Sequence, residues 1–97
     1  MAGLLHWESR QQVLILRGEL DRETLLPLWQ QRETLLAGKV CINVAQLMRV
    51  DSAGLALLVR LQHWRDNVLT LSGISRQLHA LIVLYNLQHI IAAEAVT

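Results

Sequence analysis

The segment Asp51-Ser52-Ala53-Gly54 combines residue types that suit a phosphate contact or a phosphorylation site. Asp51 or Ser52 can cap the helix predicted to follow, and Ala53 and Gly54 leave the N–H groups of its first turn uncovered. The partial positive charge and unpaired donors of a helix N-terminus stabilise a phosphate there. Ser52 is therefore a chemically sensible phosphoacceptor or partner contact. An ordinary capped helix start explains the same four residues, and on this segment alone it is the simpler interpretation.

Trp29 is a second candidate for contact with a partner. It lies beside Leu28 in the first predicted helix, and both side chains cannot point straight into the core. Large aromatic residues often anchor interfaces. The helical pattern also fits a core tryptophan, which is the commoner role. We therefore place Trp29 second to Asp51, Ser52, Ala53 and Gly54 as a partner-binding residue.

Other kinds of chemistry have little support in the sequence. The histidines show no metal-ligand spacing; they are His6, His63, His79 and His89. Cys41 lies in a β-branched run, which favours a buried small side chain over a nucleophile. Neither a phosphate-binding G-x-x-x-x-G-K-[ST] loop nor a dinucleotide-binding G-x-G-x-x-G motif occurs. We expect no catalytic residue, no metal and no cofactor, and therefore no enzyme.

Charge and hydropathy exclude further classes of partner. Nine basic and eight acidic residues are spread along the chain, without the concentrated cationic footprint of a nucleic-acid or polybasic membrane binder. The longest run without a polar side chain, Ala53–Val59, is far shorter than the roughly 20 residues of a membrane span. Cys41 is the only cysteine, which suits the reducing cytoplasm. The chain is 53% hydrophobic, so we expect some apolar surface to face a protein partner.

Hydrophobic periodicity predicts a single α/β domain over residues 1–97 with the element order ββαβαβα. Short connections imply parallel strands, and an initial hairpin adds an antiparallel one, so we expect a mixed sheet of about four strands with three to four helices. The predicted strands span residues 4–8, 12–18, 40–44 and 68–72, and the predicted helices span residues 25–36, 52–65 and 76–85. Thr24 and Ser75 can cap the first and third of these helices, and Gly38 is placed to end the first in a left-handed turn. Residues 45–50 read as an irregular link, and residues 87–97 as an ambiguous tail.

Two motifs in this order and spacing resemble the STAS family, the domain of anti-sigma-factor antagonists and sulfate transporter tails. Gly18-Glu19-Leu20-Asp21 ends the second strand, and Asp51-Ser52-Ala53-Gly54-Leu55 follows the central strand. The resemblance covers essentially the whole chain and implies the STAS fold.

The resemblance also implies roles for residues of the second motif. Ser52 matches the family's Ser or Thr that is phosphorylated in sigma-factor switches and lies at the partner surface. Asp51 matches the preceding acidic residue, and Gly54 the family glycine. Two positions depart from the pattern: Ala53 replaces a second hydroxyl or glycine, and Asn43 stands where an Asp is common.

A narrower likeness is carried by Leu25-Leu26-Pro27-Leu28-Trp29, by Gly54-Leu55-Ala56-Leu57-Leu58 and by Leu84-Tyr85-Asn86-Leu87. These segments are similar to the small cytoplasmic STAS subunits of the Mla phospholipid ABC transporters of Gram-negative bacteria. That likeness implies a regulatory or assembly subunit that binds the ATP-binding subunit, with its permease in the full complex, peripherally at the inner membrane. Such a system maintains outer-membrane lipid asymmetry. An anti-sigma factor antagonist switched by phosphorylation of Ser52 is the alternative with the same fold.

Overall fold

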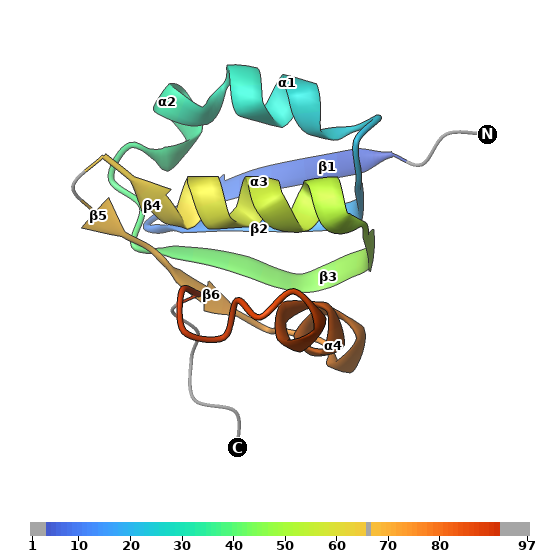
Figure 1. Cartoon of the computed structure of the whole chain (residues 1–97). Coiled ribbons are helices and arrows are strands. Elements are labelled where there is room, and N and C mark those ends of the chain that lie inside the picture. Colours follow the sequence, from blue (N-terminus) through green and yellow to red (C-terminus); the bar gives the residue numbers. More distant parts are fainter. Residues whose placement is uncertain (1–3, 66, 92–97) are drawn as a thin grey trace.

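The computed structural model describes residues 4–65 and 67–91 and contains a four-stranded mixed sheet in the order β1-β2-β3-β6 (Figure 1). β1 pairs antiparallel with β2, whereas β2–β3 and β3–β6 are parallel pairs. The sheet strands are β1 (Leu5–Arg10), β2 (Val13–Leu20), β3 (Cys41–Val50) and β6 (Thr70–Ser72). The other elements are α1 (Leu25–Gln30), α2 (Arg32–Leu36), α3 (Ser52–Gln62), β4 (His63–Trp64), β5 (Asn67–Val68) and α4 (Arg76–Leu84). The α/β class and the mixed sheet are confirmed.

The hydrophobic core lies between one face of the sheet and the helices. α3 contacts β3, α1 and α4, so it forms the middle of the helical layer (Figure 1). This central position explains why α3 is apolar on most of its sides. The core is built largely from leucine, with Leu14, Leu16 and Ile42 from the sheet and Leu28, Leu55, Leu58, Leu61, Leu78 and Ile82 from the helices. The longest helices are nonetheless short, and none in the described part of the chain is long and apolar enough to cross a membrane.

β3 continues to Val50, so the prediction of an irregular link over residues 45–50 is wrong. The strand pairs with β2 along this whole segment, but the register shifts twice, between Ile15 and Arg17 and between Gly18 and Glu19. At each shift β3 contributes one residue more than β2, and Met48 is the extra residue at the second. These bulges destroy the two-residue alternation on which the sequence-based prediction rested.

The first predicted helix, over residues 25–36, is divided at Gln31 into α1 and α2. Arg32 Nη1 donates to the carbonyl oxygen of Trp29 at this break, over 2.8 Å. Thr24 occupies the N-cap position of α1, but its side chain makes no cap hydrogen bond. Its hydroxyl instead donates to the Glu19 carbonyl over 2.9 Å and helps to fasten the preceding turn.

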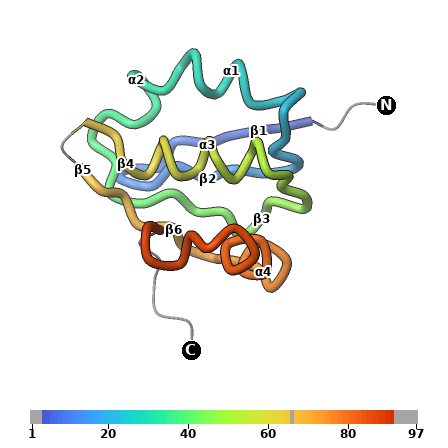
Figure 2. The backbone as a smooth tube through the Cα atoms, viewed as in Figure 1, coloured from blue at the N-terminus to red at the C-terminus, as the bar shows by residue number. Residues whose placement is uncertain are grey.

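The C-terminal third differs from expectation mainly in its strands. The predicted strand over residues 68–72 is divided, because β5 pairs with β4 in a small hairpin and only β6 joins the main sheet. Helix α3 accordingly ends at Gln62 rather than near Arg65. The expected cap of α4 is confirmed: Ser75 Oγ accepts from the Leu78 N–H over 3.1 Å. Residues 87–91 continue from α4 as a turn (Figure 2). Ile91 in this segment is buried, and the remaining tail lies outside the described residues.

Candidate partner-docking site

The two motifs singled out in the sequence lie against each other in the fold. The backbone N–H of Asp51 donates to the carbonyl oxygen of Leu20 over 3.3 Å, and the N–H of Arg22 donates to Asp51 Oδ2 over 3.2 Å. A Cβ added to Gly54 would overlap that Leu20 carbonyl oxygen and lie 2.9 Å from its carbon. Glycine is therefore required at position 54 because the first turn of α3 touches the backbone at the end of β2.

The turn on the β2 side is held by its own hydrogen bonds. Asp21 is almost fully buried, and its Oδ1 accepts from the N–H groups of Glu23 and Thr24, over 2.9 and 3.1 Å. The Thr24 hydroxyl in turn accepts from the Asp21 N–H over 3.0 Å. The backbone against which α3 begins is thus fixed before any partner arrives.

Asp51, rather than Ser52, caps α3. Its Oδ1 accepts from the Gly54 N–H over 2.8 Å, and its backbone is extended, as an N-cap requires. Ser52 is the first helical residue and is exposed. This arrangement leaves the serine hydroxyl accessible at the surface, which a contact residue or a phosphoacceptor needs.

Replacing Asp51 with alanine is expected to lower the free energy of unfolding by about 2 kcal/mol, because the cap and the link to Arg22 are both lost. Ser75→Ala provides a matched control, since Ser75 caps α4 through a single hydrogen bond and should cost only about 1 kcal/mol. Urea unfolding followed by circular dichroism measures both. Equal losses in the two variants would contradict a role for Asp51 in joining the motifs.

A groove between α1 and α3 brings Trp29 together with the Asp51–Gly54 segment. The groove holds about 260 Å³ and is lined by Leu25, Trp29, Ala53, Ala56, Leu57 and Arg60. We call it the α1–α3 groove. Of the predicted site residues it includes Trp29 and Ala53, while Ser52 directly precedes Ala53 at its end. Trp29, Ser52 and Ala53 therefore lie along one surface beside α3, whereas Gly54 is buried against the end of β2 and Asp51 is half-buried.

Sequence reasoning missed four residues of this groove: Leu25, Ala56, Leu57 and Arg60. The sequence spacing indicates part of this groove. Ala53 and Ala56 are small residues three positions apart on one face of α3, and Leu25 and Trp29 are four positions apart on one face of α1. That these two faces meet depends on the packing of α1 against α3, which no local pattern reveals.

Trp29 combines the two roles that its sequence position allowed. It is half-buried and packs against the core, yet it also lines the α1–α3 groove. The guanidinium carbon of Arg32 lies 3.9 Å from the centroid of the Trp29 ring, a stacking distance. The indole is thus supported on one side by a cation while another part of it borders the groove.

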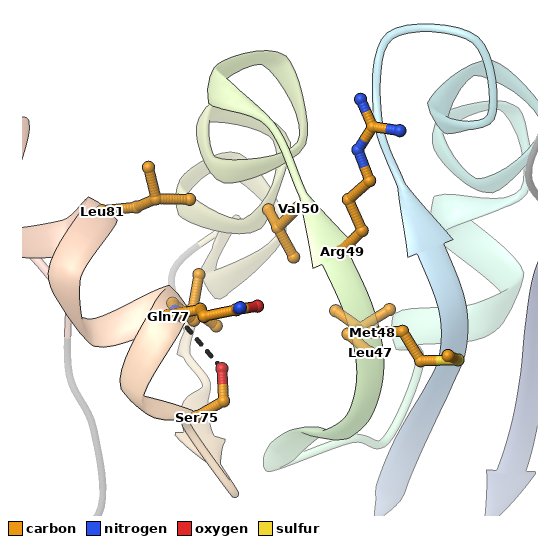
Figure 3. Close-up of a pocket in the computed structure, with 8 residues that line it drawn as sticks. Leu47, Met48, Arg49, Val50, Ser75, Gln77 and Leu81 are labelled. Carbon is orange, nitrogen blue, oxygen red and sulfur yellow. Dashed lines mark hydrogen bonds between the residues drawn. The ribbon is translucent and has the colours of Figure 1, made fainter.

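A smaller hollow lies between the end of β3 and α4 (Figure 3). Its volume is about 80 Å³, and Gln77 points from α4 toward β3 across it. Met48 lies at its edge and is 80% exposed. The hollow has room for little more than one small side chain.

In residues 4–65 and 67–91, no group of three His, Cys, Asp or Glu side chains could hold a metal ion. Cys41 is half-buried, and its Sγ lies 3.2 Å from the Ser72 hydroxyl as a hydrogen-bond donor.

Comparisons with known proteins agree with this architecture. A family model described as "Mlab, STAS domain" matches residues 4–92. The chain is 41% identical over 90 residues to the "Intermembrane phospholipid transport system binding protein MlaB" of Escherichia coli K12, covering 90% of this chain and 93% of the relative. The protein of the same description from Haemophilus influenzae is 40% identical over 65 residues, covering 57% of this chain and 62% of the relative.

One solved structure supports the fold independently. The anti-sigma factor antagonist SpoIIAA in its unphosphorylated form superimposes with a TM-score of 0.62, covering 96% of this chain and 89% of that one. Its sequence is only 18% identical, so this likeness concerns the fold alone.

Proposed function

The chain belongs to the STAS domain family described as Mlab, and from this premise we propose that it is a non-catalytic subunit that docks on the ATP-binding subunit of an intermembrane phospholipid transport system. The observation that carries the proposal is the surface along α3, where the exposed Ser52 directly precedes Ala53 of the α1–α3 groove and Trp29 lines the same groove. The relatives' description as binding proteins of such a system supports it.

The docking surface is pre-organised. Asp51 and Gly54 tie the start of α3 to the end of β2, and Arg32 supports the Trp29 ring. A surface that is already ordered loses little conformational entropy on binding, which favours affinity. The groove residues Ala53 and Ala56 are small, so a partner side chain can approach the helix backbone closely.

A subunit of this kind acts through differential affinity. It stabilises the conformation or assembly of the ATPase to which it binds more tightly, without any chemical step of its own. The ATP hydrolysis then belongs to the partner. We place the chain in the cytoplasm, held at the inner membrane through the ATP-binding subunit and, in the full complex, its permease. The system would maintain the lipid asymmetry of the outer membrane.

Filling the α1–α3 groove tests the proposal. Ala56→Arg places a long side chain in the groove from an exposed position on α3 and is expected to weaken binding to the ATP-binding subunit at least about tenfold. The measurement is a calorimetric titration with that subunit from the same organism.

The matched control is Ala80→Arg, which adds the same side chain at an exposed position of α4, away from that groove. It should leave the affinity within about twofold of the wild type. If the wild-type chain does not bind the subunit, or if Ala56→Arg binds as tightly as the control, the proposed docking surface is wrong.

A further inference from the structure

A second, cationic hollow continues from the α1–α3 groove at the C-terminal end of α3. It holds about 490 Å³ and is lined by Trp29, Arg60, His63, Trp64 and Arg65 together with two aliphatic side chains. We call it the α3-end hollow. It shares Trp29 and Arg60 with the α1–α3 groove, so a partner that lies along α3 from Ser52 would reach it.

The lining of the α3-end hollow is aromatic and positively charged. Arg60 and Arg65 carry full charges, and His63 adds an imidazole whose Nδ1 lies 3.0 Å from the Val59 carbonyl oxygen. Arg32 is not part of the lining but stacks near both indoles, with its guanidinium carbon 3.9 Å from the Trp29 ring centroid and 5.5 Å from that of Trp64. The guanidinium of Arg65 lies 5.4 Å from the centroid of Trp64.

The described part of the chain places little negative charge against these cations. Among the described residues, Glu33 is the only carboxylate in an ion pair with a cation of this lining, 3.5 Å from Arg65 Nη2. Both side chains of that pair are about two-thirds exposed, so the ion pair contributes little to stability and Arg65 can exchange Glu33 for a carboxylate of a partner. Arg60 has no carboxylate within 4.0 Å in the described part of the chain. The hollow therefore offers guanidinium donors to an incoming acid.

We propose that the α3-end hollow receives an acidic segment of the protein partner, with carboxylates on Arg60 and Arg65 and an apolar side chain against Trp29 and Trp64. Guanidinium groups recognise carboxylates through paired, charge-assisted hydrogen bonds. The half-buried indoles supply the apolar anchor site that interfaces favour. This inference rests on the proposed function, because it specifies the chemistry of the surface that the ATP-binding subunit presents.

A protein segment fits the hollow better than an anionic membrane surface. The two indoles are half-buried and lie beside Arg32, so they line a concavity and do not project toward a bilayer. Electrostatic attachment to a membrane takes a cluster of about four to eight basic residues, whereas this chain carries a net charge of only +1.

Charge reversal tests the inference. Arg60→Glu and Arg65→Glu are each expected to weaken binding to the ATP-binding subunit by about tenfold or more, because an acidic segment would then meet a like charge. Raising the salt concentration should weaken the wild-type complex more than the Arg60→Glu complex.

Arg10→Glu is the control, since Arg10 is exposed on β1, where it pairs with Glu8, and should change affinity less than about twofold. Arg60→Ala adds no negative charge to the end of α3 and should also weaken binding to the ATP-binding subunit, but by less than Arg60→Glu. This variant keeps the test independent of any effect of the new charge on folding.

The outcomes separate the two proposals. If the wild-type chain does not bind the ATP-binding subunit, the proposed function fails. If the wild type binds and Ala56→Arg disrupts binding while both charge reversals bind normally, the function stands and the acidic-segment inference is overturned. Vesicles containing phosphatidylglycerol provide the lipid probe. The inference would be overturned in favour of an anionic lipid surface if the wild-type chain bound these vesicles, Arg60→Glu abolished that binding, and Arg60→Glu left the affinity for the ATP-binding subunit unchanged.

Discussion

Gly54→Ala is expected to lower the free energy of unfolding by at least about 3 kcal/mol, a large share of the stability of a small domain. The added methyl group would overlap the Leu20 carbonyl oxygen, and that atom belongs to a strand end fixed by the buried Asp21 and by Thr24. A flexible side chain could move aside, but this backbone cannot move without disturbing β2. Urea unfolding followed by circular dichroism measures the loss.

Gly38→Ala is the control for this substitution. Gly38 has a φ of +74°, and a Cβ added there meets no heavy atom within 4 Å. The expected cost is therefore only the backbone strain of a left-handed alanine, about 1 kcal/mol. If Gly54→Ala unfolds at the same urea concentration as Gly38→Ala, the close contact between α3 and β2 is not what position 54 requires.

Ser52→Glu is expected to weaken binding to the ATP-binding subunit by at least about a hundredfold without unfolding the chain. The residue is exposed at the first position of α3, so the new carboxylate would stand in the docking surface beside Asp51 and lose its hydration on binding. The fold should tolerate it, because a negative charge in the first turn suits the helix dipole. A titration with the ATP-binding subunit, together with a thermal melt of each protein, tests both parts.

Ser9→Glu supplies the matched control for that charge. Ser9 is exposed on β1 and lines neither the α1–α3 groove nor the α3-end hollow. Its substitution should leave the affinity within about twofold of the wild type. Equal affinity of Ser52→Glu and Ser9→Glu would show that the start of α3 lies outside the interface.

Local chemistry made the start of α3 predictable from the sequence. A capping aspartate followed by small residues predicts a helix start with accessible N–H groups, and the fold confirms the cap. Likewise Ser75 predicted the start of α4, and Gly38 the left-handed turn after α2. In each case the signal lies within a few residues of the feature that it predicts.

Features that depend on distant partners were not predictable in this way. The second half of β3 looked irregular because two bulges against β2 disrupt its alternation. The break at Gln31 is accompanied by a hydrogen bond from the Arg32 side chain, which helical periodicity does not encode. Arg60 belongs to the candidate surface only because α1 packs against α3 and places Trp29 beside it.

The most direct test of docking on the ATP-binding subunit is purification of the tagged chain from its native host, with identification of its partners and measurement of its intact mass. We expect the ATP-binding subunit of a phospholipid transport system to co-purify with a chain of unmodified mass, so that Ser52 acts as a contact. A kinase partner together with a phosphate on Ser52 would contradict it, and would assign the chain to the phosphorylation-switched antagonists of anti-sigma factors.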